Sequence, residues 1–155
     1  PFDEHIKTEG SRRTSEHPFA GPSVNHELRP VAVFTLHVMD ADGENLRRVS
    51  FDGEYNDGAA WRPDGSHLAY ASRRGRSRFD IAVTSLVDLA TRVLTSGADS
   101  YEEPSFSPDG QKIAFTVKRG TESQVFVMDA GGGDWRQLTH EGNNAGPDWS
   151  NYPEN

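Results

Sequence analysis

The chain has 155 residues, a formal net charge of −8 at pH 7 and 34% hydrophobic residues, which suits one domain with a single core. This acidity argues against nucleic acid and anionic membranes as partners, because neither attracts an acidic protein electrostatically. No apolar run reaches the length of a membrane span, so no membrane insertion is expected. The lack of cysteine excludes disulfides, thiolate metal sites and a cysteine nucleophile.

Residues 1–30 are polar and show no periodicity, so they predict an irregular N-terminal arm. One alternative stays open for part of this arm. Residues 17–28 align with the hairpin at residues 106–117 when the two are offset by 89 residues. This alignment places Val24 at the position of Ile113. Residues 17–28 are then a decayed copy of that hairpin.

A hairpin pattern occurs at Trp61-Arg62-Pro63-Asp64-Gly65 and again at Phe106-Ser107-Pro108-Asp109-Gly110. Proline presets φ for the turn, aspartate can accept a hydrogen bond from the backbone two residues on, and glycine takes a positive φ without steric cost. Asp64 and Asp109 are therefore predicted to serve the turn rather than catalysis. A third copy starts at Pro147-Asp148-Trp149-Ser150.

The surrounding unit repeats every 43 to 45 residues and predicts four strands, called a to d here. The predicted ranges are a, 59–62, 104–107 and 147–150; b, 67–72 and 112–117; c, 33–39, 80–85 and 124–129; d, 46–50, 91–95 and 135–139. Four short antiparallel strands at this period are typical of a β-propeller blade. The sequence therefore predicts an all-β propeller fold with about three blades per chain: a partial blade at 31–58, blades at 59–103 and 104–146, and the first strand of the next at 147–155.

The repeat Pro-x-Trp/Phe-Ser-Pro-Asp-Gly-x-x-Ile-Ala-Phe, followed by Val-Met-Asp-Ala, Gly-Gly and Leu-Thr, resembles the TolB-like β-propeller repeat over residues 31–155. The resemblance implies blades around an axial channel with strand a innermost, a periplasmic or extracellular location, and a role as a binding platform. The chain departs from that family in two respects. It has about three blades instead of six or more, and no counterpart of the family's N-terminal α/β domain.

About three blades are too few for a closed ring, which needs about four at least. In one interpretation, chains associate: the last strand a of one chain completes the partial blade of the next, giving a closed ring or a fibre. In the other, the chain is a fragment of a longer propeller, such as an accessory part of a larger secreted enzyme. Trp61, Phe106 and Trp149 share one position on strand a and are predicted to pack between blades.

The loops between strands d and a are predicted to lie near the channel, so their polar residues are the candidate binding site. These channel-rim candidates are Tyr55, Asn56, Asp57, Tyr101, Glu102, Glu103, Asn143 and Asn144. Such an acidic, aromatic-edged rim suits a basic peptide or a cation such as Ca²⁺. The alternative is that these are solvated loop residues. No spacing matches a Ca²⁺-binding loop and no histidines are paired at metal-ligand spacing, so no cofactor or metal site is predicted.

The basic cluster Arg74, Arg76 and Arg78 lies at a predicted b–c turn. It is either a solvated turn or, together with Trp149, a contact for another copy of this acidic chain. No Gly-x-Ser-x-Gly elbow is present. The sequence thus favours a non-catalytic protein that acts through protein–protein contacts, chiefly with itself as a homo-oligomer or filament. The alternative is a hydrolase or lyase acting on polysaccharide through Asp57, Tyr101 and Glu102.

Overall fold

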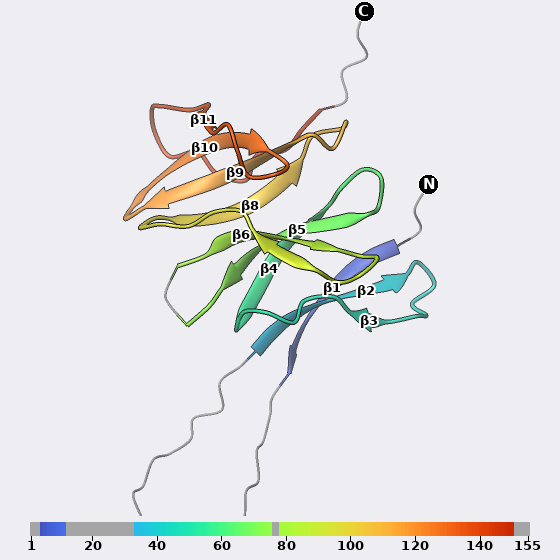
Figure 1. The fold of residues 1–155 in the computed structure, drawn as a ribbon. Helices are drawn as coiled ribbons and strands as arrows, with labels where there is room; N and C mark the ends of the chain where they lie inside the picture. The colour runs from blue at the N-terminus through green and yellow to red at the C-terminus, as the bar shows by residue number, and fades with distance from the viewer. Residues whose placement is uncertain (1–3, 12–32, 76–77, 151–155) are drawn as a thin grey trace, which may run out of the picture.

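A computed structural model describes residues 33–75 and 78–150 and the backbone of residues 4–11. Every secondary-structure element in these ranges is a β-strand, and the strands form two curled sheets that lie face to face (Figure 1). No helix that could cross a bilayer occurs in the described ranges. The prediction of an all-β fold built from propeller blades is confirmed.

The described strands make two complete blades and one partial blade. Blade 1 is β4 to β7 and blade 2 is β8 to β11, each paired in chain order, whereas the partial blade contains β1, β2 and β3. The bounds are β1 Glu4–Ser11, β2 Val33–Asp40, β3 Arg47–Arg48, β4 Tyr55–Trp61, β5 His67–Arg73, β6 Asp80–Ser85, β7 Thr91–Val93, β8 Ser100–Phe106, β9 Lys112–Arg119, β10 Glu122–Asp129 and β11 Arg136–Gln137.

The Pro-Asp-Gly turns join strands a and b as predicted. In blade 2 the amide of Gly110 donates to the carbonyl of Ser107 at 2.7 Å, and Gly110 has a φ of 68°. The carboxylate of Asp109 accepts a hydrogen bond from the amide of Gln111 at 3.0 Å, and Asp64 makes the equivalent bond in blade 1. The interpretation of both aspartates as turn residues is confirmed.

Packing between blades forms the core, which explains why β5 and β9 are each buried at five consecutive positions. Successive side chains of a strand point to opposite faces, and both faces of blade 1 are covered. One core lies between the partial blade and blade 1 and contains Leu36, Val38, Val49, Leu68, Tyr70, Ala82 and Leu86. The other lies between blades 1 and 2 and contains Ala69, Ile81, Tyr101, Phe106, Ile113, Phe115, Val117 and Met128.

Trp61 packs against the first core and Phe106 belongs to the second, so the prediction that both pack between blades is confirmed. A hydroxyl group just after strand d recurs in all three units. Its oxygen accepts the amide hydrogen of a strand c residue 14 positions earlier, at a point that the short strand d does not reach. The pairs are Ser50 with Leu36, Thr95 with Ile81 and Thr139 with Val125, at 2.8 to 2.9 Å.

The strand β1 is a departure from the predicted irregular arm. It pairs antiparallel with β2 from Glu4 opposite Asp40 to Ser11 opposite Val33, and it takes the place that strand b has beside strand c in a complete blade. Main-chain pairing does not need alternating apolar side chains, so the sequence pattern could not predict it. The proposed decayed hairpin at 17–28 lies outside the described residues.

Strand a also differs from the prediction. β4 and β8 begin at Tyr55 and Ser100, before the predicted starts at 59 and 104. The prediction missed the first residues of each strand because a bulge interrupts the alternation of side chains there. Gly58 and Glu103 have φ values of 63° and 55° at these bulges. Residues 147–150 form no strand ladder with the rest of the described chain, in which no strand b follows them, so their assignment as strand a stays a prediction.

Candidate functional site

Three of the channel-rim candidates are structural residues. Asn56 is fully buried and donates from Nδ2 to the carbonyl of Phe34 at 3.1 Å, which ties blade 1 to the partial blade. The ring of Tyr55 lies 4.3 Å from that of Phe34 and 5.5 Å from that of Phe79. Tyr101 is buried in the core between blades 1 and 2, and this burial raises the pKa of its hydroxyl. Asn56 and Tyr101 are therefore buried in contacts between blades, whereas Tyr55 is half-buried.

The three carboxylates of the predicted rim differ in their contacts. Glu102 forms an ion pair with Lys118 at 2.7 Å, and this hydrogen bond raises the pKa of the lysine. Glu103 accepts hydrogen bonds from Thr116 Oγ1 and from the amide of Gly146, both at 2.8 Å. Asp57 is exposed. No group of three or more metal-ligating side chains occurs within residues 33–75 and 78–150, and a channel cation stays a prediction.

Asn143 and Asn144 hold the segment 143–150 against blade 2. Asn143 Oδ1 accepts the amide hydrogen of Ser123 at 3.0 Å, and the amide of Asn144 donates to the carbonyl of Ser123 at 2.9 Å. Further along, Trp149 Nε1 donates to the carbonyl of Ser105 at 3.0 Å. The segment therefore lies along blade 2 near its strand a.

The basic cluster lies at the turn between β5 and β6. Arg74 is exposed and lies 3.6 Å from a carboxylate oxygen of Asp52, and Arg78 is also exposed. Arg76 lies outside the described residues. The role of this cluster in self-association stays a prediction, as does that of Trp149.

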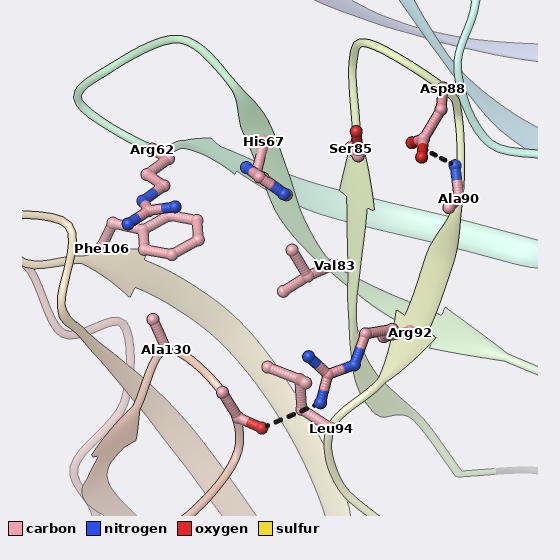
Figure 2. Close-up of a pocket in the computed structure, with 11 residues that line it drawn as sticks. Arg62, His67, Val83, Ser85, Asp88, Ala90, Arg92, Leu94, Phe106 and Ala130 are labelled. Carbon is pink, nitrogen blue, oxygen red and sulfur yellow. Dashed lines mark hydrogen bonds between the residues drawn. The ribbon is translucent and has the colours of Figure 1, made fainter.

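A pocket of about 480 Å³ lies between blades 1 and 2, at the end of the molecule that carries the a–b and c–d turns (Figure 2). The predicted rim lies at the opposite ends of the strands, so the pocket is a separate site. Its volume is within the range of small-molecule sites. Its lining is Arg62, His67, Val83, Ser85, Asp88, Ala90, Arg92, Leu94, Phe106, Ala130 and Gly131.

Two guanidinium groups give the pocket its charge. In Figure 2, those of Arg62 and Arg92 point into the space from opposite sides of Val83. Arg92 donates from Nη2 to the carbonyl of Gly131 at 3.4 Å, a long bond. Arg62 Nε lies 3.5 Å from a carboxylate oxygen of Asp64 without a hydrogen bond to it, and this buried nitrogen has no other partner in the described part of the chain.

Asp88, the carboxylate in the lining, forms hydrogen bonds within its own turn. Asp88 accepts hydrogen bonds from the hydroxyl of Ser85 and from the amide of Ala90, the latter at 3.1 Å, and these bonds lower its pKa. Asp88 is therefore anionic at neutral pH, but it does not pair with either arginine within the ranges described. Two cationic groups and the carboxylate of Asp88 thus line the pocket, and the Asp64 carboxylate lies 3.5 Å from Arg62, in a chain whose net charge is −8.

Sequence reasoning missed this pocket because its lining comes from two blades and three separate turns. One signal was present. Arg62 stands where the second hairpin has Ser107, so the two copies differ in charge at this position. The turn of the second hairpin makes space for the arginine side chain. A Cβ at Gly110 would lie 2.9 Å from Arg62 Nε, so the glycine provides this space.

No protein-family model matches the chain. The chain is 34% identical over 106 residues to the Tol-Pal system protein TolB of Anaeromyxobacter dehalogenans, an alignment that covers 68% of the chain and 24% of that protein. The crystal structure of TolB from Acinetobacter baumannii superposes with a TM-score of 0.61 at 30% identity, over 68% of the chain and 26% of that structure. These are TolB-like propeller repeats. The resemblance inferred from the Pro-Asp-Gly hairpins is confirmed.

The TolB-like chain spans about a quarter of the length of these relatives, 24% in one case and 26% in the other. The fold is shared more widely. A crystal structure of puromycin hydrolase superposes with a TM-score of 0.58 at 18% identity, over 71% of the chain and 19% of that structure. At that level of identity the similarity shows the fold alone.

Proposed function

We propose that this TolB-like chain is a non-catalytic protein-binding module that acts in the periplasm or outside the cell, and that its partner is a second copy of itself. A propeller fold shared with Tol-Pal system proteins supports the protein-interaction role. The choice of partner is argued from the face of blade 2 that points away from blade 1, called the distal face here. It carries Ala114, Val125, Val127, Arg136 and Leu138.

The observation that carries the proposal is a difference in burial between equivalent residues. Leu138 of the distal face occupies the position that Val49 has in the partial blade, 89 residues earlier. Val49 is 1% exposed because blade 1 covers it, whereas Leu138 is 45% exposed. An apolar position that is covered in one unit and open in another is a candidate contact for a further blade.

The arginine that recurs in each unit indicates which part of the next blade would contact the distal face. Arg47 of the partial blade donates to the carbonyl of Leu86 at 3.3 Å, and Arg92 of blade 1 donates to that of Gly131 at 3.4 Å. Each reaches the turn between strands c and d of the following blade. Arg136 has the same position on the distal face and is exposed. The c–d turn of the partial blade has Asp42 at the position of Gly131, which is complementary to Arg136 in charge.

In the proposed assembly, the partial blade of one copy packs on the distal face of the other. The segment 143–150 then lies beside β1, a strand whose only neighbour in the described sheet is β2. It supplies a strand a, which the partial blade does not have among the described residues, and this is addition of a strand to an open edge. Two copies with three blades each would close one six-bladed ring around a two-fold axis.

The mass of the chain in solution tests this proposal. The expected particle has twice the 17.1 kDa of one chain in mass photometry and light scattering. Arg136→Glu should weaken association about thirtyfold, because the exposed charge pair of ~1 kcal/mol occurs twice in a ring of two copies. Asp42→Arg should do the same alone and should restore association when combined with Arg136→Glu.

Arg74→Glu serves as the matched comparison, because it makes the same change in charge on the basic cluster. It should leave the mass unchanged. A monomer at every concentration would overturn association through the distal face. An effect of Arg74→Glu without one of Arg136→Glu would move the contact to the b–c turn.

A further inference from the structure

The pocket between blades 1 and 2 has the features of a binding site that is separate from the association surface. It is lined by the apolar side chains of Val83, Leu94 and Phe106, and the guanidinium groups of Arg62 and Arg92 flank this apolar surface (Figure 2). A ligand that fits both must have an apolar body and an anionic group. Carboxylates suit a pair of guanidinium groups, because the N–H groups of arginine match their two oxygens.

Both arginines have hydrogen-bonding capacity left. The Nε of Arg62 is buried against the Gly110 turn, 3.5 Å from a carboxylate oxygen of Asp64, whereas the terminal nitrogens of its guanidinium group point into the pocket (Figure 2). Arg92 makes a single contact with a backbone carbonyl at 3.4 Å, which leaves most of its five N–H groups free. An anion in the pocket would accept hydrogen bonds from the terminal nitrogens of these guanidinium groups.

The remaining polar groups of the pocket favour one class of apolar carboxylate, a peptide end, over another, a fatty acid. Asp88 and Ser85 lie at the rim of the pocket with oxygen atoms that can accept hydrogen bonds. The backbone amide of a peptide offers a donor to such acceptors, whereas the alkyl chain of a fatty acid offers none. The volume of about 480 Å³ is enough for one or two residues of a peptide.

We propose that this pocket binds the C-terminal residue of a peptide chain, with its apolar side chain against Val83, Leu94 and Phe106 and its carboxylate between Arg62 and Arg92. The site goes beyond self-association, because it lies inside one chain between two complete blades. It gives the module a second means of holding a protein, through a free chain end rather than through a blade face.

Titration of the ¹⁵N-labelled full chain with N-acetyl-leucine, N-acetyl-leucinamide and octanoate tests the proposal by NMR. N-acetyl-leucine should bind in the millimolar range, with shifts at the amides of Val83 and Ala130 and at Arg92 Nε. The amide should bind at least about tenfold more weakly, because it lacks the charge that the guanidinium groups pair with. Octanoate should also bind more weakly than N-acetyl-leucine.

Two variants connect binding to the arginines. Arg92→Gln should weaken binding of N-acetyl-leucine at least about tenfold. Arg47→Gln removes the equivalent arginine of the partial blade, which does not line the pocket, and should leave it unchanged. Arg62→Ser gives the first hairpin the residue found in the second, Ser107, and should weaken binding while the chain still folds.

Equal binding of the acid and the amide would overturn the proposal, as would full binding by Arg92→Gln. Stronger binding of octanoate than of N-acetyl-leucine would contradict the assignment to a peptide end. Saturating N-acetyl-leucine should not change the mass of the particle, which keeps this test independent of self-association.

Discussion

Replacing Thr95 with valine tests how the short outer strand is held in each blade. The Thr95 hydroxyl accepts the amide hydrogen of Ile81 at 2.8 Å and donates to the carboxylate of Asp80 at 3.0 Å. Thr95 is 3% exposed and Ile81 is fully buried. Valine has nearly the same shape, so Thr95→Val removes these bonds with little change in packing.

The expected loss of unfolding free energy follows from what is left behind. The amide of Ile81 becomes a buried donor without a partner, which costs about 1–3 kcal/mol. The bond to Asp80 adds to this loss, because that carboxylate is half-buried and burial already raises its pKa. We therefore expect a loss of about 2 kcal/mol, or a melting temperature about 4–8 °C lower for a chain of this size.

Urea unfolding, followed by tryptophan fluorescence, measures this difference. Thr95→Ser keeps the hydroxyl and should retain most of the stability. Thr139→Val removes the equivalent bond to Val125, but both residues are only half-buried, so the loss should be smaller than at Thr95. Equal stability of Thr95→Val and the unchanged chain would refute the argument from burial, and so would a larger loss at Thr139.

Three further changes have defined outcomes. Ser107→Ala removes the hydrogen bond that most lowers the pKa of Asp109. A lowered carboxyl pKa contributes stability above the unfolded value of 3.8, and this is lost as pH falls through the folded value. Ser107 Oγ also accepts the amide hydrogen of Lys112 at 2.9 Å, a bond that does not titrate, so the variant should be less stable at every pH, with a smaller difference near pH 2 than at pH 7 in urea titrations. Gly110→Ala should cost at least about 1–2 kcal/mol in the same assay, because φ is 68° there and a Cβ would meet a side chain of blade 1. Glu103→Gly relieves a φ of 55° but removes the carboxylate that binds the Gly146 amide, so global stability should change by less than about 1 kcal/mol while hydrogen exchange at Gly146 becomes faster. Unchanged exchange at Gly146 would show that Glu103 does not hold the segment 143–150.

The repeat could be predicted because turn chemistry and packing positions recur together. Asp109 is required by the turn, and Phe106 packs between blades, so both follow from the local sequence. The early part of strand a could not be predicted, because the bulges at Gly58 and Glu103 interrupt the alternation of polar and apolar residues.

The candidate site was harder to predict for two physical reasons. Polar residues near a channel were interpreted as loop residues available to a ligand, but Asn56 is fully buried and bonds to the partial blade. The pocket brings Arg62 and Arg92 together from strands that are joined only through the folded blade. Periodicity describes one strand at a time, and it says nothing about which turns of two blades meet.

The contacts of Arg47 and Arg92 have a consequence for how the blades can change during evolution. Each arginine donates to a main-chain carbonyl of the following c–d turn, at Leu86 and at Gly131. Every residue has such a carbonyl, so substitutions at the tip of the turn leave the acceptor in place. The contact therefore tolerates different tip sequences, and the tips Leu86-Val87-Asp88-Leu89 and Ala130-Gly131-Gly132-Gly133 do differ.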